Sequence, residues 1–292
     1  MMPGDHDRSH SLRPFLYLVL AIFAVSFSAI LIRLCGSSPL IIAFYRQAFS
    51  ALLVLPFLNR EERPPLPTKD YLLLTLSGLF LALHFATWIT GLTYTSVARA
   101  TLLVDLQPVW AAGLGWLILR EKVSLVETAA IALVVAGGAV AIASHWTAGA
   151  GRTGDVLALI GGFAGACYFL IGRRMRNEIS WVRYMFSVYS LSAAWLLLFS
   201  FLLFRSFPLP LQSDLPWIFA MALIPSLAGH GLFNLAIREV KGYVVNAAFM
   251  GEPVIATIFA YWLFHEKPDS YFYYGGAFVF AGLALLFYKN RE

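Results

Sequence analysis

Five ionisable side chains lie inside long apolar stretches of the chain, away from the ends of those stretches: Arg46, His84, Asp105, His230 and Glu252. A charge at the centre of a membrane-spanning helix costs roughly 2.5–3.5 kcal/mol on insertion scales, so such a group normally faces a partner or a watery cavity. We therefore expect these side chains to mark a functional site within the apolar part of the chain.

The two carboxyls and the two histidines favour recognition of a zwitterion. Asp105 and Glu252 can accept hydrogen bonds from a substrate ammonium. His84 and His230 can donate to a carboxylate, as can Asn234, which lies one helical turn after His230. The alternative for each histidine is a structural hydrogen bond to a neighbouring carbonyl.

Two prolines lie close to the carboxyls. Pro108 and Pro253 have no N–H, so the carbonyls of Val104 and Phe249, four residues earlier, lose their partners within the helix. We predict a helix break or hinge at each proline, with backbone acceptors beside the acidic residues. In the alternative interpretation the prolines only bend the helices.

A second alternative concerns the carboxyls themselves. Asp105 and Glu252 can both pair with Arg46, which would make the three side chains a structural clamp rather than a substrate site. Aromatic side chains can add a wall to a cavity, although aromatics make up 15% of the chain and most of them must pack helices. The predicted substrate-binding set is His84, Trp88, Asp105, Trp110, Tyr168, His230, Asn234, Phe249 and Glu252.

Signatures of other chemistries are missing from the sequence. It contains no G-x-x-x-x-G-K-[ST] phosphate loop and no G-x-S-x-G elbow, and HEKPD at 265–269 breaks the H-E-x-x-H pattern. Cys35 and Cys167 have no metal-ligand spacing. We expect no catalytic residue, no metal and no cofactor, and an intramembrane enzyme is the disfavoured alternative.

The elements that must position these residues are membrane helices. Hydrophobic residues make up 60% of the 292 residues and charged residues 13%, against about 45–50% and about 25% in soluble domains. A spanning helix needs about 20 mainly apolar residues. We predict an all-α integral membrane protein, with spans at 15–32, 40–58, 71–91, 100–119, 124–144, 155–172, 184–204, 214–236, 243–264 and 271–288.

The placement of Lys and Arg predicts the orientation. With the N-terminus inside, fifteen of these residues flank the cytoplasmic side and five the opposite side. Both termini are therefore expected in the cytoplasm. No loop combines a basic patch with aromatics, so no nucleic-acid partner is expected.

An internal repeat appears when the chain is offset by 145 residues. QPVWAAGLGWLILREK at 107–122 then aligns with EPVIATIFAYWLFHEK at 252–267, and Gly137 aligns with Gly282. Five helices is an odd number, so the second copy would enter the membrane from the opposite side, as in secondary transporters. The predicted organisation is a tail at 1–14, repeats at 15–146 and 155–288, a linker at 147–154 and a tail at 289–292.

The repeat resembles the drug/metabolite transporter superfamily, particularly its EamA-type bacterial members. The matching residues are Pro108, Glu121, Lys122, Gly137, Pro253, Glu266, Lys267 and Gly282, with FYRQAFSA at 44–51 similar to the second-helix segment and Arg46 in the Arg position of the family. The resemblance implies two inverted five-helix repeats in a bacterial inner membrane and export of small metabolites by alternating access.

Within that superfamily we compare the chain first with aromatic amino-acid exporters, although no residue separates them from relatives that carry drugs or nucleotide sugars. A channel is a further alternative, because inverted repeats also build pores. The expected partners are a small-molecule substrate and the lipid bilayer. Proton coupling remains open, as does the choice between monomer and homodimer.

Overall fold

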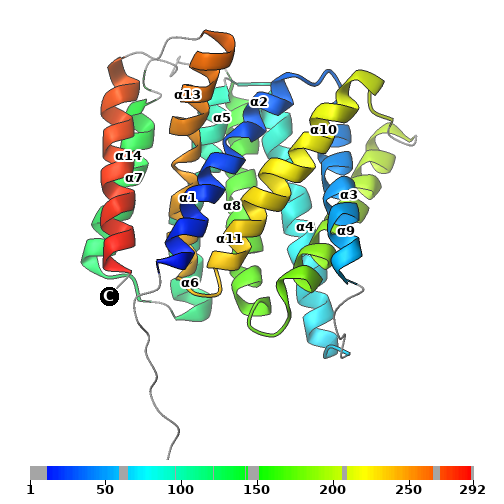
Figure 1. The fold of residues 1–292 in the computed structure, drawn as a ribbon, viewed down its shortest axis with the longest axis horizontal. Helices are drawn as coiled ribbons and strands as arrows, with labels where there is room; N and C mark the ends of the chain where they lie inside the picture. Colours follow the sequence, from blue (N-terminus) through cyan, green and yellow to red (C-terminus); the bar gives the residue numbers. More distant parts are fainter. Residues whose placement is uncertain are drawn as a thin grey trace, which may run out of the picture.

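A computed structural model describes residues 12–58, 65–95, 97–120, 122–141, 143, 151–205, 209–265 and 270–290. These residues form a helical bundle without strands (Figure 1). In chain order the elements are α1 (Arg13–Val25), α2 (Phe27–Arg33), α3 (Pro39–Leu58), α4 (Thr68–Gly91), α5 (Val97–Val104), α6 (Gln107–Leu119), α7 (Leu125–Ala141), α8 (Arg152–Met175), α9 (Trp181–Phe204), a 3-10 turn η2 (Gln212–Asp214), α10 (Leu215–Met221), a π-helical segment η3 (Ala222–His230), α11 (Gly231–Ala236), α12 (Gly242–Phe249), α13 (Glu252–Phe264) and α14 (Ser270–Lys289).

These elements coincide with the ten predicted spans. Nine helical stretches of the described residues are long and apolar enough to cross a membrane, and α7 is a shorter apolar helix of 17 residues at the predicted fifth span. The chain is thus a multi-pass bundle in which Arg13 and Lys289 lie at the same end (Figure 1). The predicted turns at Glu121 and at Glu266–Lys267 lie outside the described residues.

Two spans are broken at the predicted positions. α5 ends at Val104 and α6 begins at Gln107, and α12 ends at Phe249 and α13 begins at Glu252, so both breaks have the same bounds under the 145-residue offset. Each proline is at the second position of the following helix, where its missing N–H costs nothing.

The second halves of the two broken spans also end alike. α6 and α13 each have 13 residues, and each is closed by a residue in the left-handed region at φ 56°, Arg120 and His265 respectively.

The helices that close the two halves, α7 and α14, pack against each other through small residues. A Cβ atom added to Gly137 would lie 2.8 Å from the Gly275 carbonyl, and one added to Gly282 would lie 2.9 Å from the Ala130 carbonyl. These glycines let the backbones of α7 and α14 approach each other within the chain.

The two ends of the bundle are packed differently. Near the end that holds Arg13 and Lys289, α6 packs against α12. At the opposite end the other halves of the same spans, α5 and α13, contact each other much less (Figure 1). The middle of the bundle is therefore more firmly closed toward the end that holds the termini.

Candidate functional site

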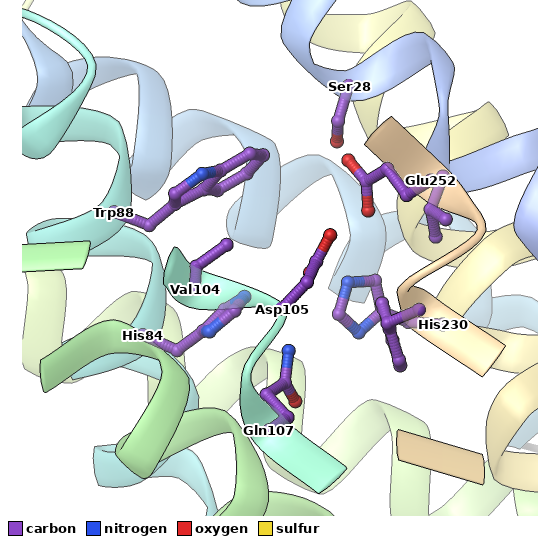
Figure 2. Close-up of a pocket in the computed structure, with 10 residues that line it drawn as sticks. Ser28, His84, Trp88, Val104, Asp105, Gln107, His230 and Glu252 are labelled. Carbon is purple, nitrogen blue, oxygen red and sulfur yellow. The ribbon is translucent and has the colours of Figure 1, made fainter. Parts of the chain in front are cut away.

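A narrow cavity lies where the two helix breaks face each other (Figure 2). About 250 Å³ of space not filled by atoms, open solvent included, lies between the side chains that line it. The lining residues come from α1, α2, α4, η3 and both breaks: Val25, Ser28, His84, Trp88, Val104, Asp105, Gln107, His230, Phe249 and Glu252. Six of these residues belong to the predicted set: His84, Trp88, Asp105, His230, Phe249 and Glu252.

The two carboxyls point toward one another in the cavity (Figure 2). Asp105 is 1% exposed and Glu252 4% exposed, and they interact electrostatically. Asp105 Oδ2 and Glu252 Oε1 have no hydrogen-bond partner within the described part of the chain. Both carboxyls therefore keep an acceptor for a guest in the cavity.

The alternative clamp does not form among the described residues. Arg46 is fully buried in α3 and donates to Ser226 Oγ at 2.7 Å and to Ser28 Oγ at 3.1 Å. In the described part of the chain no ion pair joins it to Asp105 or Glu252. The carboxyls and the guanidinium are thus held near one cavity without neutralising each other.

His84 adopts the structural hydrogen bond that we considered as its alternative. Its Nδ1 lies 2.9 Å from the Gly161 carbonyl, and since a carbonyl can only accept, Nδ1 is the donor. The neutral ring then has an acceptor, Nε2, for the cavity. Trp88 stacks on this ring at 6.0 Å between centroids, and its buried Nε1 has no partner among the described residues.

His230 lies across the cavity from His84, at 6.2 Å between ring centroids, and its Nδ1 has no partner in the described chain. Asn234 lies one turn away and is fully buried. Its Nδ2 donates to Tyr168 Oη at 2.6 Å and to the His230 carbonyl at 2.9 Å. Asn234 and Tyr168 therefore support His230 from behind rather than line the cavity.

Close approach of α8 to the first break depends on glycine. A Cβ atom on Gly162 would lie 2.6 Å from the Val104 carbonyl, and one on Gly165 would lie 2.7 Å from Gln107 Oε1 and 2.9 Å from His84 Nδ1. The small residues of α8 thus allow Gln107 and His84 to pack directly against its backbone.

One predicted residue lies elsewhere. Trp110 is 38% exposed on α6 and packs edge-to-face on Phe163, at 5.7 Å between ring centroids, so it is not brought to the cavity. α6 starts at Gln107, and three residues further along the helix the side chain at position 110 points outward.

Four cavity residues were absent from the predicted set: Val25, Ser28, Val104 and Gln107. The repeat holds a signal for two of them, because the 145-residue offset aligns Val104 with Phe249 and Gln107 with Glu252. Val25 and Ser28 flank a break at Ser26, where the Ser26 hydroxyl donates to the Ile22 carbonyl at 2.7 Å, and no proline marks that break.

The arrangement is suited to binding a polar guest. It offers carboxylate and imidazole acceptors, an unpartnered indole N–H, and no group of three or more His, Cys, Asp or Glu side chains that could hold a metal within the described residues. Such acceptors are the partners that an ammonium group requires.

Comparison with known proteins identifies a family to which both parts of the chain are similar. The sequence model of the EamA-like transporter family matches the chain twice, at residues 12–143 and 152–288.

Individual relatives cover nearly the whole chain. An uncharacterized transporter of Archaeoglobus fulgidus is 27% identical over 269 residues, which are 92% of this chain and 94% of the relative. The S-adenosylmethionine uptake transporter of Rickettsia prowazekii is 24% identical over 258 residues, 86% of this chain and 83% of the relative. A solved crystal structure with 17% identity has the same fold, with a TM-score of 0.76 over 95% of this chain and 99% of that one.

Proposed function

Because this chain belongs to the EamA-like transporter family, we propose that it is a secondary or facilitative carrier that exports amino acids with aromatic or other apolar side chains. Both relatives are named as transporters, and the rickettsial one carries a small metabolite, S-adenosylmethionine. The amino acid and the direction are our proposal.

The observation that carries this proposal is the pair of unpartnered carboxyl oxygens in the cavity. Asp105 Oδ2 and Glu252 Oε1 lack donors within the described chain, and lone pairs buried without a partner cost free energy. A substrate ammonium supplies the missing donors. Trp88 and Phe249 in the same lining offer contact to an apolar side chain.

The rickettsial relative supports the same class of substrate. S-adenosylmethionine carries an α-amino and an α-carboxyl group, which are the groups shared by all amino acids.

We also propose that the chain consists of two inverted five-helix repeats that alternate around the cavity. The two family matches and the identical bounds of the two breaks support this duplication. The excess of Lys and Arg on one side supports cytoplasmic termini in a bacterial inner membrane.

The test is counterflow in proteoliposomes. Vesicles preloaded with unlabelled phenylalanine, threonine or methionine receive the labelled amino acid outside, with and without a pH gradient. We expect saturable accumulation, and a response to the gradient would indicate proton coupling. A correctly inserted protein without counterflow would disprove the amino-acid proposal and favour drugs or nucleotide-type metabolites, whereas non-saturable flux would indicate a channel.

A further inference from the structure

Arg46 is a buried charge with incomplete partners. Its side chain is 0% exposed in the middle of α3, and the guanidinium lies 4.2 Å from the centroid of the Phe85 ring. Two of its nitrogens donate to the hydroxyls of Ser226 and Ser28. The third nitrogen, Nη2, has no hydrogen-bond partner in the described part of the chain.

This charge lacks a counter-ion at contact distance. Glu252 attracts Arg46 electrostatically, but no ion pair forms between them in the described chain. Two hydroxyls and an aromatic face compensate a charge only partly, and charges inside a membrane normally pair or face a functional cavity. Arg46 is therefore poised to receive an anion.

The residues to which we first assigned the carboxylate of a zwitterion are mostly occupied. Asn234 Nδ2 donates to Tyr168 and to the His230 carbonyl, and His84 donates through Nδ1 to Gly161. His230 keeps an unpartnered Nδ1, but an imidazole is not permanently charged. Among these candidates Arg46 alone is charged at every working pH and has a planar fork that matches a carboxylate.

Arg46 lies directly behind the cavity wall. Ser28, which accepts its Nη1–H, lines the cavity together with Glu252. The Phe85 ring, under the guanidinium, has its centroid 4.8 Å from that of the His84 ring and 5.5 Å from that of the His230 ring. If the Ser28 hydroxyl were displaced, Nη1 and Nη2 of Arg46 could both donate hydrogen bonds to a guest held by the two carboxyls.

We propose that Arg46 binds the carboxylate of the substrate in place of the Ser28 hydroxyl, while Asp105 and Glu252 hold its ammonium. The substrate is then a zwitterion with a free carboxylate, not an amine or a neutral drug. This inference rests on the proposed amino-acid transport and assigns the residue that recognises the anionic end.

The wild-type protein tests the inference through competition with labelled phenylalanine. Unlabelled phenylalanine, its amide and phenethylamine share the ring and the amino group, but the last two lack the carboxylate. We expect the two analogues to compete at least about tenfold more weakly, because hydrogen bonds between charged groups are the strong class. Equal competition by all three compounds would overturn the inference while leaving amino-acid transport established.

Variants of Arg46 test the residue itself. Arg46→Gln should raise KM for phenylalanine by about tenfold or more and abolish its advantage over the amide, whereas Arg46→Lys should retain part of that advantage. A merely structural arginine would lower the amount of folded protein, measured by thermal unfolding, and leave the preference unchanged; that result would overturn the assignment. Absence of counterflow in the wild type would refute the proposed function, and the inference with it.

Discussion

Asp105 and Glu252 illustrate how a bundle of membrane helices can hold two carboxyl groups close together (Figure 2). Each lies at a helix break, where backbone groups are released from the helical pattern, and each is almost completely buried. Buried carboxyls of this kind are costly unless they gain donors, so the arrangement favours a state in which a proton or a substrate ammonium is shared between them. Binding and proton coupling can therefore use the same two groups.

We predict that Asp105→Asn and Glu252→Gln each raise KM for an amino-acid substrate by about tenfold or more, because each removes a charge-assisted hydrogen bond of about 1.5–3 kcal/mol. Counterflow kinetics measure the effect. Glu178→Gln, at an exposed position, is the matched control and should behave as the wild type. If proton coupling runs through this pair, one variant should also lose its response to a pH gradient. Unchanged rates and pH profiles in both variants would remove the pair from transport.

Six of the predicted residues line the candidate cavity, but the hydrogen bonds around it could not be predicted from the sequence. Buried charges and prolines are visible in an apolar sequence because they violate its pattern, which is why Asp105, Glu252 and the histidines were found. Which nitrogen of His84 is occupied depends on the Gly161 carbonyl of another helix, 77 residues away. Trp110 was misplaced for a similar reason, since the face of a helix that turns inward is decided by its packing.

Among the helices, the close approach of the α8 backbone to the α5–α6 break positions the candidate site. α8 reaches the α5–α6 break because Gly161, Gly162 and Gly165 present no side chain to it. Gly162 of α8 faces the Val104 carbonyl at the break, and the Gly161 carbonyl accepts the hydrogen bond from His84. In a membrane, where helices gain little from hydrophobic burial, such close approach is a main source of association.

We predict that Gly162→Ala destabilises the protein by about 1–3 kcal/mol, the usual cost of overpacking. The added Cβ would lie 2.6 Å from a backbone oxygen, which a side-chain rotation cannot relieve. Gly113→Ala is the control, since a Cβ there meets nothing within 4 Å and should be neutral or stabilising by up to about 1 kcal/mol. Thermal unfolding in detergent compares the two, and equal stability of both variants would contradict this account of the α8 contact.

The sequence predicted where the membrane helices lie better than it predicted where they are interrupted. Span length is fixed by the membrane, so the ten apolar stretches could be located within a few residues. Proline marked the breaks near positions 108 and 253. The break at Ser26 was not predicted. The Ser26 hydroxyl donates to the Ile22 carbonyl there, and a serine inside a helix forms such a bond in some structures but points to solvent in others.

In the whole bundle, the two ends differ in how closely their helices pack, although both halves of the chain match the same family model. Near the termini, α6 packs against α12, whose residues are all buried; at the other end α5 and α13 contact each other much less. A carrier with two similar halves can reverse this inequality by exchanging which pair of half-helices is closed. The described arrangement is thus closed toward the termini and corresponds to an outward-facing form if the termini are cytoplasmic.

The accessibility of single cysteines tests that arrangement. In a background of Cys35→Ala and Cys167→Ala, we predict that a membrane-impermeant thiol reagent added outside modifies Ser28→Cys faster than Asn246→Cys, because Ser28 lines the cavity whereas Asn246, in α12, does not. Ser213→Cys and Glu178→Cys, at exposed positions near opposite ends, report which face the reagent reaches.

Substrate should slow the modification of Ser28→Cys, because that side chain lies at the wall that the substrate occupies. Modification of Ser28→Cys only from the side reached at Glu178→Cys would reverse the assigned form, since the cavity would then open toward the termini. Equally fast modification from both sides would contradict the assigned form, because an outward-facing cavity is closed toward the termini. The side from which Ser28→Cys is modified therefore tests the assigned form without knowledge of the transported amino acid.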